Sequence, residues 1–211
     1  EDRDVSETFT DLAKERYNVV PEASAEKIEE ENGEKIAHLN NGDTVRADEI
    51  LMATGRVPNT DNLNLAENTS IDLTERGFIE ADNGMRTSVE GVYTLGDIAD
   101  NFMFKHSANY EASIVYKNMN GMNVEADFTA MPHAVFTDPQ IAGVGKTEQE
   151  LEEENTEYRK SVYDYEKTGM GQAMKEEDGI VKVLAQGDEI LGVHIIGPEA
   201  STLIHEVLPV M

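Results

Sequence analysis

The chain has 211 residues, enough to bury a core in one large domain or two small ones. Its 43 acidic residues outnumber 17 lysines and arginines, and the formal net charge of -26 argues against nucleic acid or an anionic membrane surface as a partner. The sequence has no cysteine, no apolar run as long as a membrane span and no signal peptide, so we expect a cytoplasmic protein whose thiol chemistry is supplied from outside these residues.

The first 57 residues have the pattern of the closing half of an α/β unit. Asp4 and Glu7 predict a capping box for an amphipathic helix that ends near residue 17. Two extended segments follow, with Asn-Gly turns at 32–33 and 41–42. The run "EILMATG" then predicts a short apolar strand that ends at Gly55. Because glycine has no side chain, the backbone there can approach a phosphate or ribose, but a tight turn at the end of the strand explains the glycine equally well.

The central part is rich in loops and contains "GVYTLGDIADNFMFKHSANYEA". Its strand runs into Gly96 and Asp97, and a helix is predicted from about His106 to Met119. A carboxylate at a strand end accepts hydrogen bonds from ligand hydroxyl groups, and the first N–H groups of a helix attract an anion or a carbonyl. Taken alone, an aspartate at this place is explained equally well as a turn residue.

Beyond residue 128 the pattern changes to an antiparallel sheet with helices, an α+β module. Thr147 and Glu150 predict a capping box for a short acidic helix. Three extended segments follow, the last two joined by a hairpin at 186–189, and a helix is predicted from about Glu199. The predicted fold class is therefore α/β followed by α+β.

The sequence predicts no metal site. Its five histidines are dispersed, and no second histidine or paired carboxylate has ligand spacing with His106. His106 itself is open to three interpretations, as a metal ligand, a base or a helix-start residue. His205 and Glu206 are neighbours, and neighbours on a helix face apart, which argues against a catalytic pair.

Four segments in series resemble one family closely. They are "ILMATGRVPNTDNLNL", "GVYTLGDIADNFMFKHSANYEA", "AVFTDPQIAGVGKTEQEL" and "GIVKVLAQGDEILGVHIIGPEASTLIHE". In this order they are similar to the FAD-dependent pyridine nucleotide–disulfide oxidoreductases over essentially the whole chain. The resemblance implies the closing half of an NAD(P)-binding domain at 1–57, a central FAD-binding segment at 58–128 and a truncated antiparallel-sheet dimerisation domain at 129–211. It also implies a homodimer, and the acidic composition is that of halophile proteins.

The resemblance assigns roles to particular residues. Asp97, which follows Gly96, matches the aspartate that binds the flavin ribityl chain. Backbone N–H groups that meet the pyrimidine edge of the flavin and stabilise negative charge on it are implied for Met103, Phe104, Lys105 and His106. Gly55 matches a backbone contact to the nicotinamide nucleotide, and Ala25 is a weaker candidate for another.

The implied activity is electron transfer between NAD(P)H, FAD and a dithiol or disulfide. Among members of the family, dihydrolipoamide dehydrogenase is the first candidate, and a mycothione-type or mercuric reductase is the alternative. The implied partner is a small-molecule disulfide or a lipoyl-bearing protein. The family's redox-active cysteine pair and its His-Glu pair are expected outside residues 1–211, so no catalytic residue is predicted here. This chain alone is expected to be inactive and to hold FAD weakly or not at all. A non-catalytic dimerisation or binding module is the alternative of another class, in which Asp97 and "MFKH" would have no reason to persist.

Overall fold

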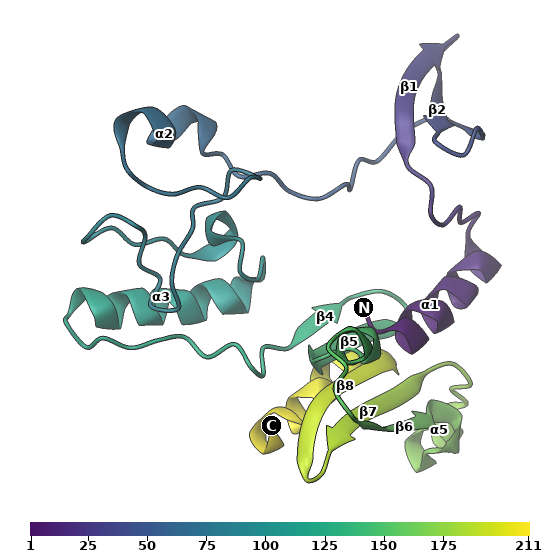
Figure 1. The fold of residues 1–211 in the computed structure, drawn as a ribbon. Coiled ribbons are helices and arrows are strands. Elements are labelled where there is room, and N and C mark those ends of the chain that lie inside the picture. The colour runs from purple at the N-terminus through teal and green to yellow at the C-terminus, as the bar shows by residue number, and fades with distance from the viewer. The chain divides into compact units, whose positions relative to one another are not determined.

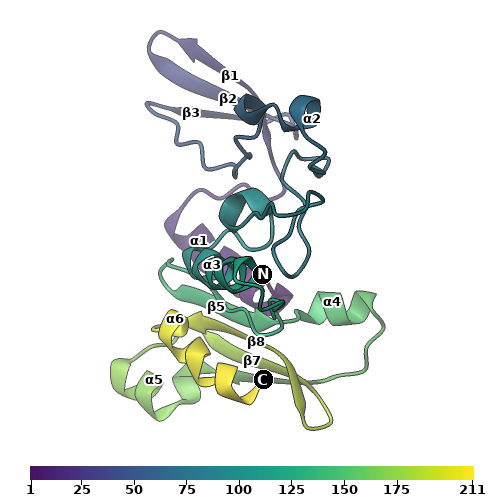
Figure 2. The same cartoon turned by 90° about the vertical axis from the view of Figure 1, so that its left-hand side faces the viewer.

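The computed structural model describes residues 1–211, the side chain of Ala66 excepted. The chain forms two compact units, one made of residues 1–9 and 57–211 and the other of residues 10–56. None of the helices described combines the length and apolar character needed to cross a membrane. Figures 1 and 2 show the elements from two sides.

The unit of residues 10–56 contains the second half of α1 (Arg3–Arg16) and an antiparallel sheet of three strands. The sheet has the order β1-β2-β3, with bounds β1 (Ala25–Glu31), β2 (Glu34–Leu39) and β3 (Thr44–Ala47). Both predicted Asn-Gly turns are confirmed. Asn32 and Gly33 have φ of 54° and 87°, as a two-residue hairpin turn of this kind requires, and Gly42 has φ of 90°.

Two local predictions in this part of the chain are wrong. Asp2, not Asp4, caps α1, because its Oδ1 accepts a hydrogen bond from Asp4 N–H at 3.0 Å. The apolar run before Gly55 forms no strand, and Leu51 is 91% exposed. Such a run is typical of a strand buried between two neighbours, and no strand in residues 1–211 pairs with it.

The central segment surrounds one long helix, α3 (Lys105–Met119), which starts one residue before the predicted His106 and ends before Gly121, as predicted. Before α3 lie the short helices η1 (Asp61–Leu63), α2 (Leu65–Asn68) and η2 (Gly96–Ala99). The inner face of α3 packs into an apolar cluster of Met85, Ile114, Val115 and Ala126.

The C-terminal part is a five-stranded antiparallel sheet in the order β4-β5-β8-β7-β6. The strands are β4 (His133–Val135), β5 (Gln140–Gly145), β6 (Arg159–Asp164), β7 (Ile180–Gln186) and β8 (Glu189–Gly197). The helices are α4 (Glu148–Glu153), η3 (Tyr165–Lys167), α5 (Gly169–Met174), α6 (Ala200–Leu203), η4 (Ile204–Glu206) and η5 (Leu208–Val210). Ala200 and Ile204 pack on the buried residues of β5 and β8, so the C-terminal helices cover one face of the sheet (Figure 2).

The predicted capping box of α4 is confirmed, because Thr147 N–H donates to Glu150 Oε2 and Thr147 Oγ1 accepts from Glu150 N–H. The predicted hairpin is confirmed by the pairing of Gln186 with Glu189. α5 was not predicted from the sequence, and Thr168 caps it by accepting a hydrogen bond from Gly171 N–H at 2.9 Å.

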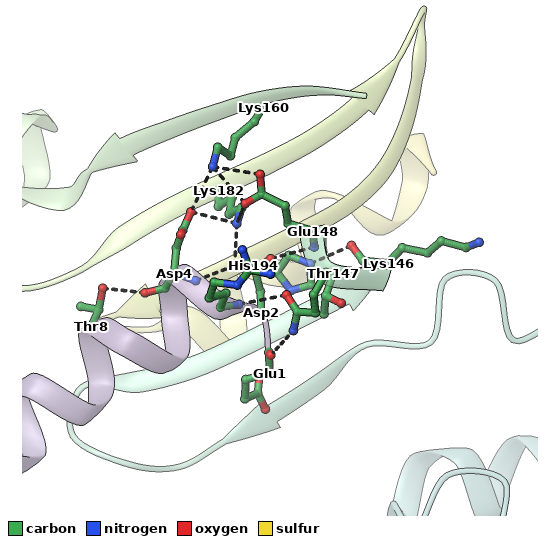
Figure 3. A network of polar contacts seen from close by, with 12 residues as sticks. Glu1, Asp2, Asp4, Thr8, Lys146, Thr147, Glu148, Lys160, Lys182 and His194 are labelled. Atoms are coloured by element: carbon green, nitrogen blue, oxygen red, sulfur yellow. Dashed lines mark hydrogen bonds and ion pairs between the residues drawn. The ribbon is translucent and has the colours of Figure 1, made fainter. Parts of the chain in front are cut away.

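A buried ion cluster joins the first residues of the chain to the C-terminal sheet (Figure 3). Lys182 on β7 is fully buried, and its Nζ lies 2.8 Å from both Asp2 Oδ1 and Asp4 Oδ2. Glu148 Oε2 is 2.5 Å from the same nitrogen, and Lys160 Nζ is 2.9 Å from Glu148 Oε1. Three carboxylates therefore share two ammonium groups, only one of which is fully buried.

Hydrogen bonding outweighs burial in setting the charge of this cluster. Burial alone raises the pKa of Glu148, but hydrogen bonds from Lys182, Lys160 and Tyr158 lower that pKa to about 2. Burial likewise raises the pKa of Asp2, and the hydrogen bond from Lys182 overcomes it, so that pKa is lowered. For Lys182, burial lowers the pKa and the hydrogen bonds to the three carboxylates raise it above its ordinary value. Glu148, Asp2 and Lys182 are therefore ionised at neutral pH.

We expect acid to destabilise the protein through Glu148. Its pKa is about 2 in the folded protein against 4.5 as the ordinary value, so its contribution is complete above pH 4.5 and is lost as the pH falls toward 2. The loss is on the order of 2–3 kcal/mol. Urea unfolding of the wild type and of Glu148→Gln at pH 6, 4 and 3 measures it.

The difference in unfolding free energy between wild type and Glu148→Gln should be largest at pH 6 and shrink as the pH falls. Glu153→Gln, an exposed glutamate of the same helix, is the matched control and should differ little from wild type at any of these pH values. A wild-type advantage over Glu148→Gln that stays constant from pH 6 to pH 3 would contradict the assignment.

Candidate functional site

The predicted flavin contacts lie on two elements that pack directly together, η2 and the start of α3. Gly96, the first residue of η2, has φ of +74°, a conformation that favours glycine. A Cβ at Gly96 would lie 3.5 Å from the Cβ of Ala108, so the turn rests on a small residue of α3. The two elements that the sequence analysis expected to act together are therefore side by side.

Asp97 follows Gly96 in the first turn of η2, and its side chain is exposed. The backbone around it is well anchored, since Ile98 carbonyl accepts a hydrogen bond from Ile79 N–H at 3.0 Å and Ala99 is buried. An exposed carboxylate on an anchored turn is suited to accept hydrogen bonds from the hydroxyl groups of a ligand.

The N-terminus of α3 has no side-chain cap. The N-cap residue is Phe104, in extended conformation, and it has no side chain able to accept from the first turn. The N–H groups of Lys105 and His106 have no acceptor within the helix, because the first four N–H groups of any helix lack one. Phe104 N–H already donates to Phe102 carbonyl at 2.7 Å, and Met103 precedes the helix. Lys105 and His106 thus carry the N–H groups best suited to an electronegative partner.

The His106 ring contributes packing and one hydrogen bond. Its Nε2 lies 2.9 Å from Pro132 carbonyl oxygen, so this nitrogen donates. The ring stacks on Phe104, with centroids 5.3 Å apart and planes 6° apart. Of the three interpretations of His106, the geometry favours the helix-start residue. Among residues 1–211 as described, no group of three or more histidine or acidic side chains is placed to hold a metal ion.

A cavity of about 470 Å³ opens beside the start of α3. Phe104, Lys105 and His106 form one side of it, and residues 132–136 together with α6 and η4 form the rest. Its volume lies in the range of small-molecule sites. The cavity leaves room next to the uncapped helix start, and Asp97 lies outside it.

The two predicted nicotinamide nucleotide contacts lie in the other unit, residues 10–56. Gly55 is exposed with φ of +105°, and no atom lies within 4 Å of the position of an added Cβ. Ala25 opens β1, where it pairs with Leu39 and is exposed. Both residues are exposed, and their roles stay predictions.

Two buried charged residues were not singled out from the sequence. Glu111 is fully buried on α3 and accepts a hydrogen bond from Gly96 N–H, and Lys182 is fully buried on β7. Each breaks the local pattern, since Glu111 falls on the buried face of α3 and Lys182 lies on the same face of β7 as buried Leu184. A charge at a position that the pattern assigns to the core is the signal that would have identified both.

Two family models match the chain. The model described as "Pyridine nucleotide-disulphide oxidoreductase" matches residues 1–112, and the model of the pyridine nucleotide-disulphide oxidoreductase dimerisation domain matches residues 131–211. Dihydrolipoyl dehydrogenase of Staphylococcus aureus is 35% identical over 193 residues, which cover 89% of this chain and 41% of that protein. Mycothione reductase of Mycobacterium tuberculosis is 34% identical over 218 residues, covering 100% of this chain and 47% of that protein.

Solved structures have the same fold. LpdA from Mycobacterium tuberculosis superposes with a TM-score of 0.89 at 24% sequence identity, covering 100% of this chain and 46% of that one. The flavoprotein disulfide reductase RclA from Escherichia coli superposes with a TM-score of 0.87 at 22% identity, covering 100% of this chain and 49% of that one. The chain spans about half the length of the curated relatives that it matches.

The expected fold class is confirmed, with part of a nucleotide-binding α/β domain followed by an antiparallel-sheet dimerisation domain. The family resemblance of the four sequence segments is confirmed as well, because one family model alone covers more than half of the residues. This chain belongs to the pyridine nucleotide–disulphide oxidoreductase family.

Proposed function

We propose that the full-length protein that carries this chain is an FAD-dependent enzyme that moves electrons between NAD(P)H, FAD and a disulfide or dithiol substrate. One observation supports this proposal above the others: in a chain of this family, an exposed carboxylate at Asp97 and the uncapped start of α3 lie on two elements in direct contact. Residues 1–211 contain no cysteine, so the thiols of the reaction belong to other residues or to the substrate.

The residues present fit a flavin. The Asp97 carboxylate is exposed and would accept hydrogen bonds from the ribityl hydroxyl groups, and the N–H groups of Lys105 and His106 would donate to an electronegative edge of the flavin ring. The positive end of the α3 dipole then stabilises negative charge on that edge. FAD supplies the hydride and electron transfer when bound, and the part of this chain is to bind and orient it.

The proposed organisation follows the expected boundaries. Residues 1–57 complete the NAD(P)-binding domain with Gly55 and Ala25 near the nucleotide, 58–128 form the central FAD-binding segment, and 129–211 form the dimerisation domain. The match to a dimerisation-domain model supports a homodimer.

For the substrate, we place dihydrolipoamide first, free or on a lipoyl-bearing protein, because a dihydrolipoyl dehydrogenase matches at 35% identity. A mycothione-type disulfide is the second candidate, since a mycothione reductase matches over the whole of this chain. Steady-state assays of the full-length protein with lipoamide and with mycothione, each with NADH and NADPH, decide between them.

We expect Asp97→Ala to weaken FAD binding by about 10- to 100-fold, because a hydrogen bond to a charged acceptor contributes about 1.5–3 kcal/mol. The measurement is the Kd of FAD for the full-length protein after removal and readdition of the flavin. Asp100→Asn is the matched control, since Asp100 lies three residues further in the same turn and pairs with Arg76 at 3.5 Å. Equal FAD affinity in wild type and Asp97→Ala would remove Asp97 from the site, and a full-length protein that binds no FAD would support a non-catalytic module.

A further inference from the structure

Glu111 is a fully buried carboxylate on α3 that contacts both ends of the turn carrying Asp97. Its Oε2 accepts a hydrogen bond from Gly96 N–H at 2.5 Å, and its Oε1 accepts one from Asn101 Nδ2 at 3.3 Å. Gly96 directly precedes Asp97, and Asn101 follows the turn by two residues. One side chain therefore ties segment 96–101 to α3 at two points.

The position of Glu111 is unusual for a residue that only fills space. It lies on the buried face of α3 with Ile114 and Val115, where an apolar side chain of similar size avoids the cost of taking a charge out of water. The carboxylate is compensated by its two donors, one of which is a backbone N–H that is itself buried. The charge thus serves to hold a particular backbone segment.

Segment 96–101 needs such an anchor. Gly96 and Asp100 both have left-handed backbone conformation, with φ of 74° and 54°, so the turn is bounded by two residues whose conformation differs from that of the chain around them. Glycine in particular has access to several alternative conformations. The two hydrogen bonds to Glu111 fix this turn together with the hydrogen bond from Ile79 N–H to Ile98 carbonyl and the ion pair of Arg76 with Asp100.

We propose that Glu111 is a positioning residue for the flavin: it fixes the Asp97 carboxylate relative to the N–H groups at the start of α3. This inference rests on the proposed function, in which the two groups hold different parts of one ligand. Groups that hold two parts of one ligand from two elements must be kept within about 0.5 Å of the productive geometry. A side chain that joins the two elements provides that geometry directly.

The test compares Glu111→Ala, Glu111→Gln and Asp97→Ala in the full-length protein, each by the Kd of FAD for the apoprotein. Asn118→Ala is the matched control, because Asn118 is also buried on α3 and makes three hydrogen bonds, to Gly84 and Val124, away from the turn. The thermal midpoint of each apoprotein and the hydrogen exchange of the peptide containing Gly96 are measured alongside.

We expect Glu111→Ala to weaken FAD binding by about tenfold or more, with faster exchange at Gly96. Glu111→Gln, which keeps an acceptor for Gly96 N–H, should recover most of the affinity. Asn118→Ala should lower the thermal midpoint without changing the Kd. If Glu111→Ala does not fold, Asn101→Ala replaces it, since it removes one of the two ties at an exposed residue and should weaken FAD binding less than Asp97→Ala does.

The possible outcomes distinguish a failure of the role proposed for Glu111 from a failure of the proposed flavin site. Loss of affinity in Asp97→Ala with none in Glu111→Ala or Asn101→Ala overturns the role of Glu111 and leaves the site intact. Equal losses in Glu111→Ala and Asn118→Ala overturn it too, since they show a general structural effect. A third outcome is faster exchange at Gly96 in Glu111→Ala with FAD affinity unchanged in both Glu111→Ala and Asp97→Ala. This result would show that Glu111 holds the turn but that the turn does not bind the flavin.

Discussion

Lys182→Met is expected to lower the free energy of unfolding by about 3–5 kcal/mol, because removing one partner of a buried ion pair leaves the others buried and uncompensated. Lys182 is fully buried, and Asp2, Asp4 and Glu148 all lie within 2.8 Å of its Nζ. Methionine keeps most of the volume of the side chain, so the loss reports on charge rather than on a cavity. Chemical denaturation at pH 7 measures it.

Lys160→Met is the matched control for this prediction. Lys160 pairs with the same Glu148, but its side chain is 41% exposed, so its loss should cost no more than about 1 kcal/mol. Adding Glu148→Gln to Lys182→Met removes one of the stranded charges and should recover part of the stability. Equal losses from the two lysine variants would show that burial does not set the strength of this cluster.

Salt is expected to have the second large effect. Moving from dilute buffer to about 2 M KCl should raise the thermal midpoint by on the order of 10 °C, which for a chain of this size corresponds to a few kcal/mol. The chain has 43 acidic and 17 basic residues, and every residue of β1 is exposed, among them four glutamates. Repulsion between such carboxylates is screened within about 3 Å at 1 M salt. Thermal melts over a KCl series measure the shift.

Sucrose is the control for the salt series, since it favours the folded state by exclusion from the surface and does not screen charge. At equal osmolality it should raise the midpoint much less than KCl does. A midpoint that is the same in dilute buffer and in several-molar KCl would show that self-repulsion does not limit stability, and the halophile-like composition would then need another explanation.

Features fixed by short stretches of sequence were predictable. The Asn-Gly turns, the α4 capping box and the 186–189 hairpin each depend on residues within four positions of one another, and all were predicted. α3 was predicted to within one residue because its apolar period and its Asn-Gly end are both local. The fold class followed from the family resemblance carried by four motifs in series.

Features fixed by distant partners were not predictable. Asp2 rather than Asp4 caps α1, and the reason lies 146 or more residues away, where Glu148 N–H donates to Asp2 and Lys182 pairs with both aspartates. The apolar run before Gly55 was predicted as a strand from its composition, but a strand also needs a neighbour, and none in residues 1–211 pairs with it. The local sequence pattern cannot predict which distant residue pairs with a charge or which distant segment pairs with a strand.

The sequence predicted the residues of the candidate site that would contact a ligand, but it did not predict Glu111, which holds their backbone in place. Asp97 and the start of α3 carry the sequence signal, because a carboxylate after an apolar run and a helix start are both visible along the chain. The strand predicted before Gly96 is wrong, since that run makes only an isolated bridge between Tyr93 and Arg86. Glu111 carries only a weak signal, a charge on the buried face of a helix, and its two partners become evident only when the turn is folded against α3.

Hydrogen exchange of the full-length protein with and without FAD tests most directly whether Asp97 and the start of α3 hold a flavin. We predict that FAD slows exchange in peptides covering residues 96–107, with little change in peptides covering 61–69 or 165–175. Stoichiometric binding of FAD with protection elsewhere and none in residues 96–107 would contradict this site.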